Sequence, residues 1–204
     1  MRKLTSQVVL FATAACGGGT AKTPDAAVSI DAPVETLGAA PALAIACTDA
    51  TADVYTLPSN LPAMSDAHRG DVFRCSPTES LSAYKVNAQI AAYNVGYPLA
   101  ATPVETSGFW TYRIAYRTER NTVNNARAEG ETPAFLLVPE KPLAGAPLIV
   151  FGHGSAGVAA KCAPSLQSLS APVIDHDFAP ALLRLAGAGY TVIAPDFTAS
   201  VSSA

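Results

Sequence analysis

Hydrophobic and polar residues alternate over residues 109–118, and this period of two predicts a half-buried strand. The side expected to face the core carries Trp110, Tyr112, Ile114 and Tyr116. The side expected to be solvated carries Arg113, Ala115 and Arg117. A polar run at 119–130 predicts a turn, and the apolar run at 134–138, closed by Pro139, predicts a second strand. An antiparallel strand pair is therefore expected here.

Two short apolar runs without alternation follow, at residues 148–151 and 190–194, and they predict strands buried on both faces. Small and apolar residues at 178–188 predict a helix between them that ends at Gly187 and Gly189. A strand–helix–strand order implies a right-handed crossover between parallel strands. The predicted fold class is α/β, with an antiparallel pair followed by a βαβ unit.

The segment upstream of the first predicted strand combines a turn-rich part with a part of helical spacing. Residues 53–80 are rich in turn-forming residues and predict an irregular segment. Residues 79–94 have helical spacing, with Thr78 as a candidate cap. The expected core positions of this helix are Leu81, Tyr84, Ile90 and Tyr93.

The N-terminus has the pattern of an export signal. Arg2 and Lys3 precede an uncharged stretch at 4–15, which is too short to span a bilayer as a helix. Small residues before Cys16 and glycines after it resemble a bacterial lipoprotein signal, although Thr13 stands where such signals carry leucine. We predict a signal peptide over 1–16 with lipidation of Cys16; an ordinary cleaved secretory signal is the alternative. Residues 17–50, rich in Ala, Thr, Pro and Gly, predict a disordered linker.

Composition narrows the class of protein. Half of the residues are hydrophobic and 14% are charged, which is enough for a buried core. The net charge of −3 excludes the basic stripe expected of a nucleic-acid binder. An exported chain permits disulfides, and Cys47 and Cys75 could close a loop, which leaves Cys162 without a partner.

The stretch with the clearest chemistry is IVFGHGSAG at residues 149–157, where an apolar strand runs into a His-Gly turn. In α/β-hydrolases a loop after the third strand supplies a backbone N–H to the oxyanion hole, and glycines permit close approach to the substrate. By this reasoning the amide of Ser155 or Gly154 is the donor, and His153 positions the loop. An ordinary glycine turn is the alternative interpretation.

The alternative that Ser155 is itself the nucleophile fits its neighbours in the sequence poorly. HGSAG differs from the Gly-x-Ser-x-Gly elbow because the bulky His153 occupies the position that needs a small residue. The only later histidine is His176, which is too close along the chain for the usual triad order. Asp175, His176 and Asp177 are three adjacent residues, so a solvated loop is favoured there over a metal site.

Other segments strengthen the interpretation of the His-Gly turn. They are DVY at 53–55, GDVFR at 70–74, YRT at 116–118, CAPS at 162–165 and GYTVIAPDF at 189–197. With HGSAG they resemble the secretory lipase-like branch of the α/β-hydrolases, over about residues 53–197. The resemblance implies that 51–204 is the N-terminal part of an α/β-hydrolase domain. It also implies that Asp196 organises a loop.

The implied activity is extracytoplasmic hydrolysis of small-molecule or lipid acyl esters through an acyl-enzyme, with no metal and no organic cofactor. The lipoprotein-like signal at Cys16 adds the expectation of a lipid anchor to the membrane. No residue of this chain matches the family's nucleophile elbow, acid or histidine, so we expect these groups beyond residue 204 and the sheet to be incomplete. The alternative is a catalytically inactive, truncated remnant or a binding lipoprotein. Whether this chain is itself an enzyme therefore stays open.

Overall fold

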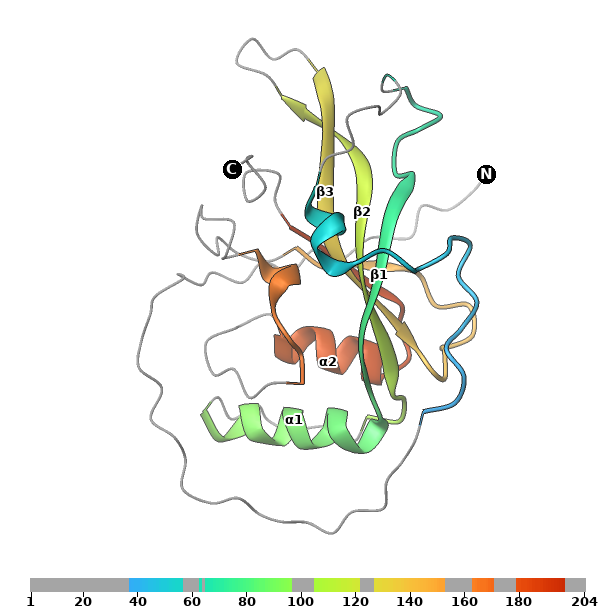
Figure 1. Ribbon diagram of the computed structural model, residues 1–204. Helices are drawn as coiled ribbons and strands as arrows, with labels where there is room; N and C mark the ends of the chain where they lie inside the picture. Colours follow the sequence, from blue (N-terminus) through green and yellow to red (C-terminus); the bar gives the residue numbers. More distant parts are fainter. Residues whose placement is uncertain are drawn as a thin grey trace, which may run out of the picture.

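The computed structural model describes residues 37–56, 63, 65–96, 105–121, 127–152, 163–170 and 179–196. The elements in chain order are η1 (Thr51–Tyr55), β1 (Val72–Leu81), α1 (Ala83–Gly96), β2 (Phe109–Asn121), β3 (Arg127–Pro139), β4 (Ile149–Val150), η3 (Pro164–Leu166), α2 (Ala179–Gly187) and β5 (Val192–Pro195) (Figure 1). Expectations for 1–36, including the signal peptide, Cys16 and most of the linker, lie outside the described residues.

The strands form one five-stranded mixed sheet in the order β1-β2-β3-β5-β4. β1, β2, β3 and β5 pair antiparallel, whereas β4 and β5 are parallel and α2 lies between them in the chain. The predicted α/β class is confirmed, since antiparallel strands are followed by a βαβ unit, as in an α/β-hydrolase-like sheet. Gly189, with φ at 95°, ends the α2 turn, and a Cβ there would lie 2.8 Å from the Lys141 carbonyl oxygen.

The prediction of an irregular segment over 53–80 was wrong in its second half, because Val72–Leu81 is strand β1. Pro77 lacks the N–H of a regular ladder, but β1 is an edge strand with a register shift between Pro77 and Glu79. Thr78 therefore caps no helix, and its hydroxyl donates to the Thr111 carbonyl at 2.9 Å. Helix α1 instead begins after Ser82, whose carbonyl accepts the N–H of Val86 at 2.9 Å.

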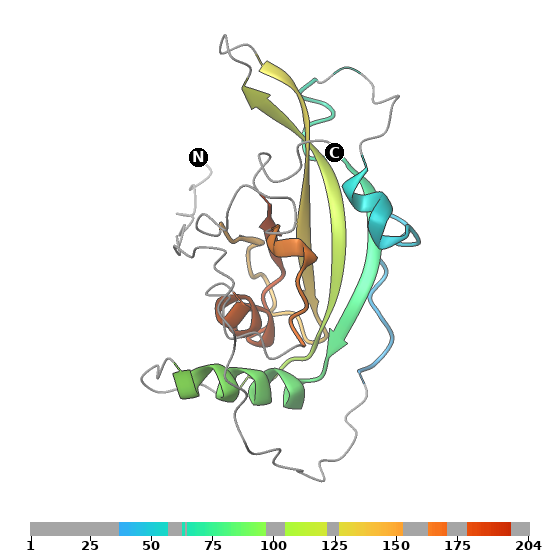
Figure 2. The same ribbon diagram turned by 60° about the vertical axis from the view of Figure 1, so that its left-hand side comes forward.

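Alternation along the strands separates two apolar clusters. On one face, α1 and α2 pack against Phe109, Phe135, Leu137, Val192 and Ala194. On the other face lie Tyr112, Ile114, Ala134, Trp110, Tyr116, Leu136, Val138 and Ile193. Figure 2 shows both helices on the same side of the sheet. We call these the helix-covered face and the helix-free face.

Strand β4 differs from its expectation. The run 148–151 was predicted to be buried on both faces, yet the side chain of Val150 is 49% exposed. The reason is its place in the sheet, because β4 is the edge strand beside β5. Ile149 packs against the cluster on the helix-covered face, so only one side of β4 is covered.

Part of the segment expected as linker packs on the helix-free face. In residues 37–50, which we call the strap, positions 41, 43, 45, 47 and 49 are half-buried and those between them exposed. Leu43 and Ile45 contact the helix-free cluster, and a disulfide joins Cys47 to Cys75 of β1. Half-buried and exposed positions alternate with a period of two in the strap. The sequence does not show this alternation because the exposed positions are mostly alanines, which are themselves apolar.

The strap then passes around the edge of the sheet. The Asp49 N–H donates to the Cys75 carbonyl at 3.0 Å, and the Cys75 N–H donates to Asp49 Oδ2 at 2.7 Å. These bonds satisfy backbone groups that an edge strand would otherwise leave open. Two residues later, the hydroxyl of Thr51 lies 3.3 Å from that of Ser76, on the opposite face from Cys75. The strap therefore leads η1 to the helix-covered face.

Candidate functional site

The carboxyl ends of the parallel strands β4 and β5 form the edge at which open α/β sheets bind ligands. After β4, the Phe151 N–H donates to the Ile193 carbonyl at 2.8 Å. After β5, the Asp196 N–H donates to the Pro133 carbonyl at 2.8 Å, and only 1% of Asp196 is exposed. Both strand ends are thus fixed by backbone bonds to neighbouring strands.

The predicted oxyanion loop starts at this edge. Gly152 is the last described residue after β4, and Ala163 is the first described residue of the next segment. His153, Gly154 and Ser155 lie between them, outside the described residues. The structure therefore locates the two flanks of the predicted loop and not the candidate residues themselves.

Asp196 binds the segment that follows the predicted loop. The N–H of Ser165 donates to Asp196 Oδ1 at 3.0 Å, and the Ser165 hydroxyl donates to Asp196 Oδ2. Both residues are almost fully buried. Asp196 therefore holds η3 against the end of β5.

Tyr55 of η1 joins this pair, because its hydroxyl oxygen lies 2.8 Å from the Ser165 hydroxyl oxygen. The Ser165 hydrogen goes to the carboxylate of Asp196, which can only accept, so Tyr55 donates and Ser165 accepts. Burial raises the pKa of Tyr55 to about 12, and the charge of Asp196 adds to the rise. Tyr55 is therefore a neutral donor across the physiological range.

Arg113 of β2 fixes the same segment from the sheet. Its Nε donates to the Ser165 carbonyl at 2.6 Å, and its Nη2 donates to the Gln167 carbonyl at 3.2 Å. The guanidinium also lies 5.7 Å from the ring centroid of Phe135. The expectation that Arg113 is solvated was wrong, because contacts more than fifty residues apart in sequence cover this side of β2.

These four residues, Tyr55, Arg113, Ser165 and Asp196, form what we call the anchor network. Three of them come from segments singled out in the sequence: DVY, CAPS and GYTVIAPDF. These three segments are far apart in the sequence, so no local pattern predicts their contact. They belong to the same set of family-like segments, and that shared membership could have indicated that they lie together. Arg113 had no such signal, since alternation alone assigns it to the solvated side.

Comparisons with known proteins give structural likeness only. No protein-family model and no curated protein sequence matches the chain. The N228W mutant of the rice cell wall degrading esterase LipA from Xanthomonas oryzae is similar, with a TM-score of 0.42 and 18% identity. That match covers 62% of this chain and 29% of the esterase. Candida antarctica lipase A in its closed state matches with a TM-score of 0.45 and 18% identity, over 72% of this chain and 30% of the lipase. The chain thus spans less than a third of the length of either enzyme.

The anchor network has the chemistry of a structural support. Ser165 gives its proton to a carboxylate, is itself fully buried, and contacts no described histidine that could act as a base. His68, the one histidine in the described part of the chain, pairs on the surface with Asp71 at 2.9 Å. Across the described segments, no three His, Cys, Asp or Glu side chains gather as a metal site would require. Within the same segments, no helix has the length and hydrophobicity needed to cross a bilayer.

Proposed function

We propose that this chain carries the oxyanion loop of an extracytoplasmic serine ester hydrolase that acts on acyl esters through an acyl-enzyme. The observation that carries the proposal is the position of the HGSAG sequence. It follows Gly152 in the sequence, and Gly152 lies at the carboxyl edge of the parallel pair β4 and β5. A ligand-binding loop is expected at that edge.

The proposed chemistry uses backbone groups rather than side chains. The N–H of Ser155 or Gly154 would donate to the oxygen that becomes negative when the ester carbonyl is attacked. A preorganised donor of this kind is worth about 3–4 kcal/mol of barrier, or a factor of about 10² to 10³ in kcat. His153 would position the loop. No metal or organic cofactor takes part in this proposal.

The anchor network supports the proposal because it fixes one flank of the loop. Beyond the loop, Ser165 is held by Asp196, Tyr55 and Arg113. Before the loop, Phe151 is held by Ile193 of β5. A loop whose flanks are both tied to the same strand end needs less reorganisation during reaction, which is the condition for electrostatic stabilisation.

Attachment to a membrane through Cys16 is the second part of the proposal. Lipidated Cys16 would hold the enzyme outside the cytoplasm, near lipid or other acyl esters. Mass spectrometry of the N-terminal peptide from the exporting cell tests this part, because diacylglyceryl-modified Cys16 is expected. Cleavage elsewhere, with an unmodified Cys16 or without it, would contradict the anchor and leave the hydrolase proposal intact.

The test of the hydrolase compares two substitutions of Ser155 in the product of the complete reading frame that contains this chain. Ser155→Pro removes the backbone N–H, whereas Ser155→Ala removes only the hydroxyl. We expect p-nitrophenyl ester turnover that a fluorophosphonate blocks, a kcat about 10² to 10³ lower in S155P, and a near-normal kcat in S155A.

Each contrary result has a definite meaning. Absence of fluorophosphonate-sensitive turnover would contradict the hydrolase proposal. If S155P and Gly154→Pro each keep the kcat of the unsubstituted protein, neither backbone amide is the oxyanion donor. Loss of activity in S155A would make Ser155 the nucleophile, and the role proposed for its amide would then be wrong.

A further inference from the structure

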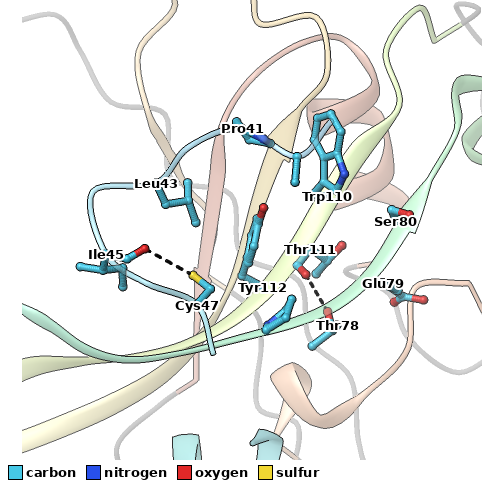
Figure 3. A pocket seen from close by; sticks show the side chains of 12 residues that line it. Pro41, Leu43, Ile45, Cys47, Thr78, Glu79, Ser80, Trp110, Thr111 and Tyr112 are labelled. Atoms are coloured by element: carbon cyan, nitrogen blue, oxygen red, sulfur yellow. Dashed lines mark hydrogen bonds between the residues drawn. The ribbon is translucent and has the colours of Figure 1, made fainter. Parts of the chain in front are cut away.

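The helix-free face contains a groove that the proposed hydrolase chemistry does not use. It lies between the strap and the first two strands of the sheet and has a volume of about 410 Å³ (Figure 3). This volume falls in the range of small-molecule sites, which is about 300–1,000 Å³. The residues that define its floor and walls are Pro41, Leu43, Ile45, Pro77, Trp110 and Tyr112.

One polar group in this groove lacks a partner. Tyr112 is only 5% exposed, its hydroxyl makes no hydrogen bond to another described residue, and the hydroxyl oxygen is open to the groove rather than sealed from solvent. Figure 3 shows the hydroxyl directed between the strap and Trp110, into the groove. Burial raises the pKa of Tyr112, so the group is neutral near pH 7. Water in the groove can reach this hydroxyl, so a ligand that hydrogen-bonds to it takes the place of water and gains the net free energy of one neutral hydrogen bond.

The groove offers no free charge from its described lining residues. Glu79 is the one Asp, Glu, Lys, Arg or His among them, and its carboxylate is used on the helix-covered side. There Glu79 accepts the Leu169 N–H at 2.6 Å and the Ser168 hydroxyl at 3.0 Å. A charged ligand would therefore lose hydration in the groove without meeting an opposite charge.

We propose that this groove binds a small uncharged molecule with a flat apolar body and one group that hydrogen-bonds to the Tyr112 hydroxyl. The flat body would lie against the ring of Trp110, between Leu43 and Pro77. The groove and the anchor network are on opposite faces of the sheet. The groove is therefore an accessory site, and a test of it does not test the hydrolase proposal.

The sole tryptophan of the chain makes the test direct. N-phenyl-1-naphthylamine is flat, uncharged and carries one N–H, and it accepts excitation energy from tryptophan. Its sulfonated counterpart, 1-anilinonaphthalene-8-sulfonate, has the same rings and a negative charge. We expect the uncharged probe to quench Trp110 emission on binding. We expect the sulfonated probe to bind at least about tenfold more weakly, because the sulfonate must be desolvated.

Two matched variants distinguish binding in the groove from nonspecific binding elsewhere on the protein. Tyr112→Phe keeps the ring and removes the hydroxyl, and should weaken binding of the uncharged probe about two- to tenfold, as expected for one neutral hydrogen bond. Tyr84→Phe removes a hydroxyl from α1 on the other side of the sheet and should leave the affinity unchanged. Far-UV circular dichroism of both variants checks that the fold is kept.

Several results would overturn the proposal. These are equal or tighter binding of the sulfonated probe, equal affinity in Y112F, and probe binding without quenching of Trp110. A full chain that binds no uncharged probe would show that the chain itself fills the groove. Binding that is lost as the chain self-associates at higher concentration would show that a second copy fills it, and either result overturns the proposal.

Discussion

The two faces of the sheet are covered in different ways. On the helix-covered face, α1 and α2 bury large side chains completely, among them Phe109, Phe135 and Leu137. On the helix-free face, one extended strap covers part of the surface, and Trp110, Leu136 and Val138 stay half-buried. The first face is stabilised by close packing of helices, whereas the second depends on a segment without regular structure that a disulfide holds in place.

This difference assigns different tasks to the two faces. The helix-covered face carries the anchor network, whose four members contact one another through buried or half-buried groups. It supports the edge after which the proposed oxyanion loop follows in the sequence. The helix-free face keeps a groove into which the hydroxyl of Tyr112 is directed (Figure 3). The anchor network and the groove thus lie on opposite faces of one sheet.

The largest effect expected is loss of a side chain from the helix-covered core. Phe135→Ala removes a fully buried ring and should lower the free energy of unfolding by about 3–5 kcal/mol, through lost burial and the cavity left behind. Val150→Ala on the exposed side of β4 should change it by less than about 0.5 kcal/mol. Urea denaturation followed by circular dichroism measures both. Similar losses in the two variants would contradict the contrast between the faces.

The disulfide is the corresponding weak point of the helix-free face. Cys47 and Cys75 are 28 residues apart in sequence, and the chain-entropy model gives about 3–4 kcal/mol for such a loop. The double variant Cys47→Ser with Cys75→Ser should lose about this much stability and shift Trp110 emission to longer wavelength as the strap detaches. A reductant should reproduce both changes in the unsubstituted chain and do nothing further to the variant. An unchanged emission would mean that the strap packs without its disulfide.

The anchor network should respond to loss of its charge. Asp196→Asn removes the carboxylate that accepts two hydrogen bonds from Ser165, and hydrogen bonds to charged groups are worth about 1.5–3 kcal/mol. We expect a loss of about 2 kcal/mol in the free energy of unfolding. Asp71→Asn, at an exposed pair with His68, should cost less than about 0.5 kcal/mol. Equal costs would show that Asp196 is not the support that its contacts indicate.

What the sequence predicted depended on how locally each element is encoded. Four elements follow from the local hydrophobic pattern: alternation predicts β2, apolar runs predict β3 and β5, and small and apolar residues closed by glycines predict α2. Strand β1 escaped prediction because Pro77 is tolerated only at a sheet edge, and edges are set by the whole topology. The packing of the strap was not predicted because alanines separate its few large residues. The bonds of Arg113 to η3 escaped because they join residues distant in sequence.

The smallest expected effect is a pH dependence that tests whether Tyr55 is buried within the network. Its folded-state pKa of about 12 lies above the ordinary value of 10.0, so the unfolded chain releases this proton first as the pH rises. The stabilisation is therefore fully present below pH 10 and is lost as the pH rises towards 12. Because Tyr55 is partly exposed, we expect its share of this loss to be about 1 kcal/mol. Tyr55→Phe should make the fall in unfolding free energy between pH 10 and 12 shallower by that amount, whereas Tyr84→Phe should not. An identical slope in Y55F would place the Tyr55 hydroxyl in solvent and remove η1 from the support of the β5 edge.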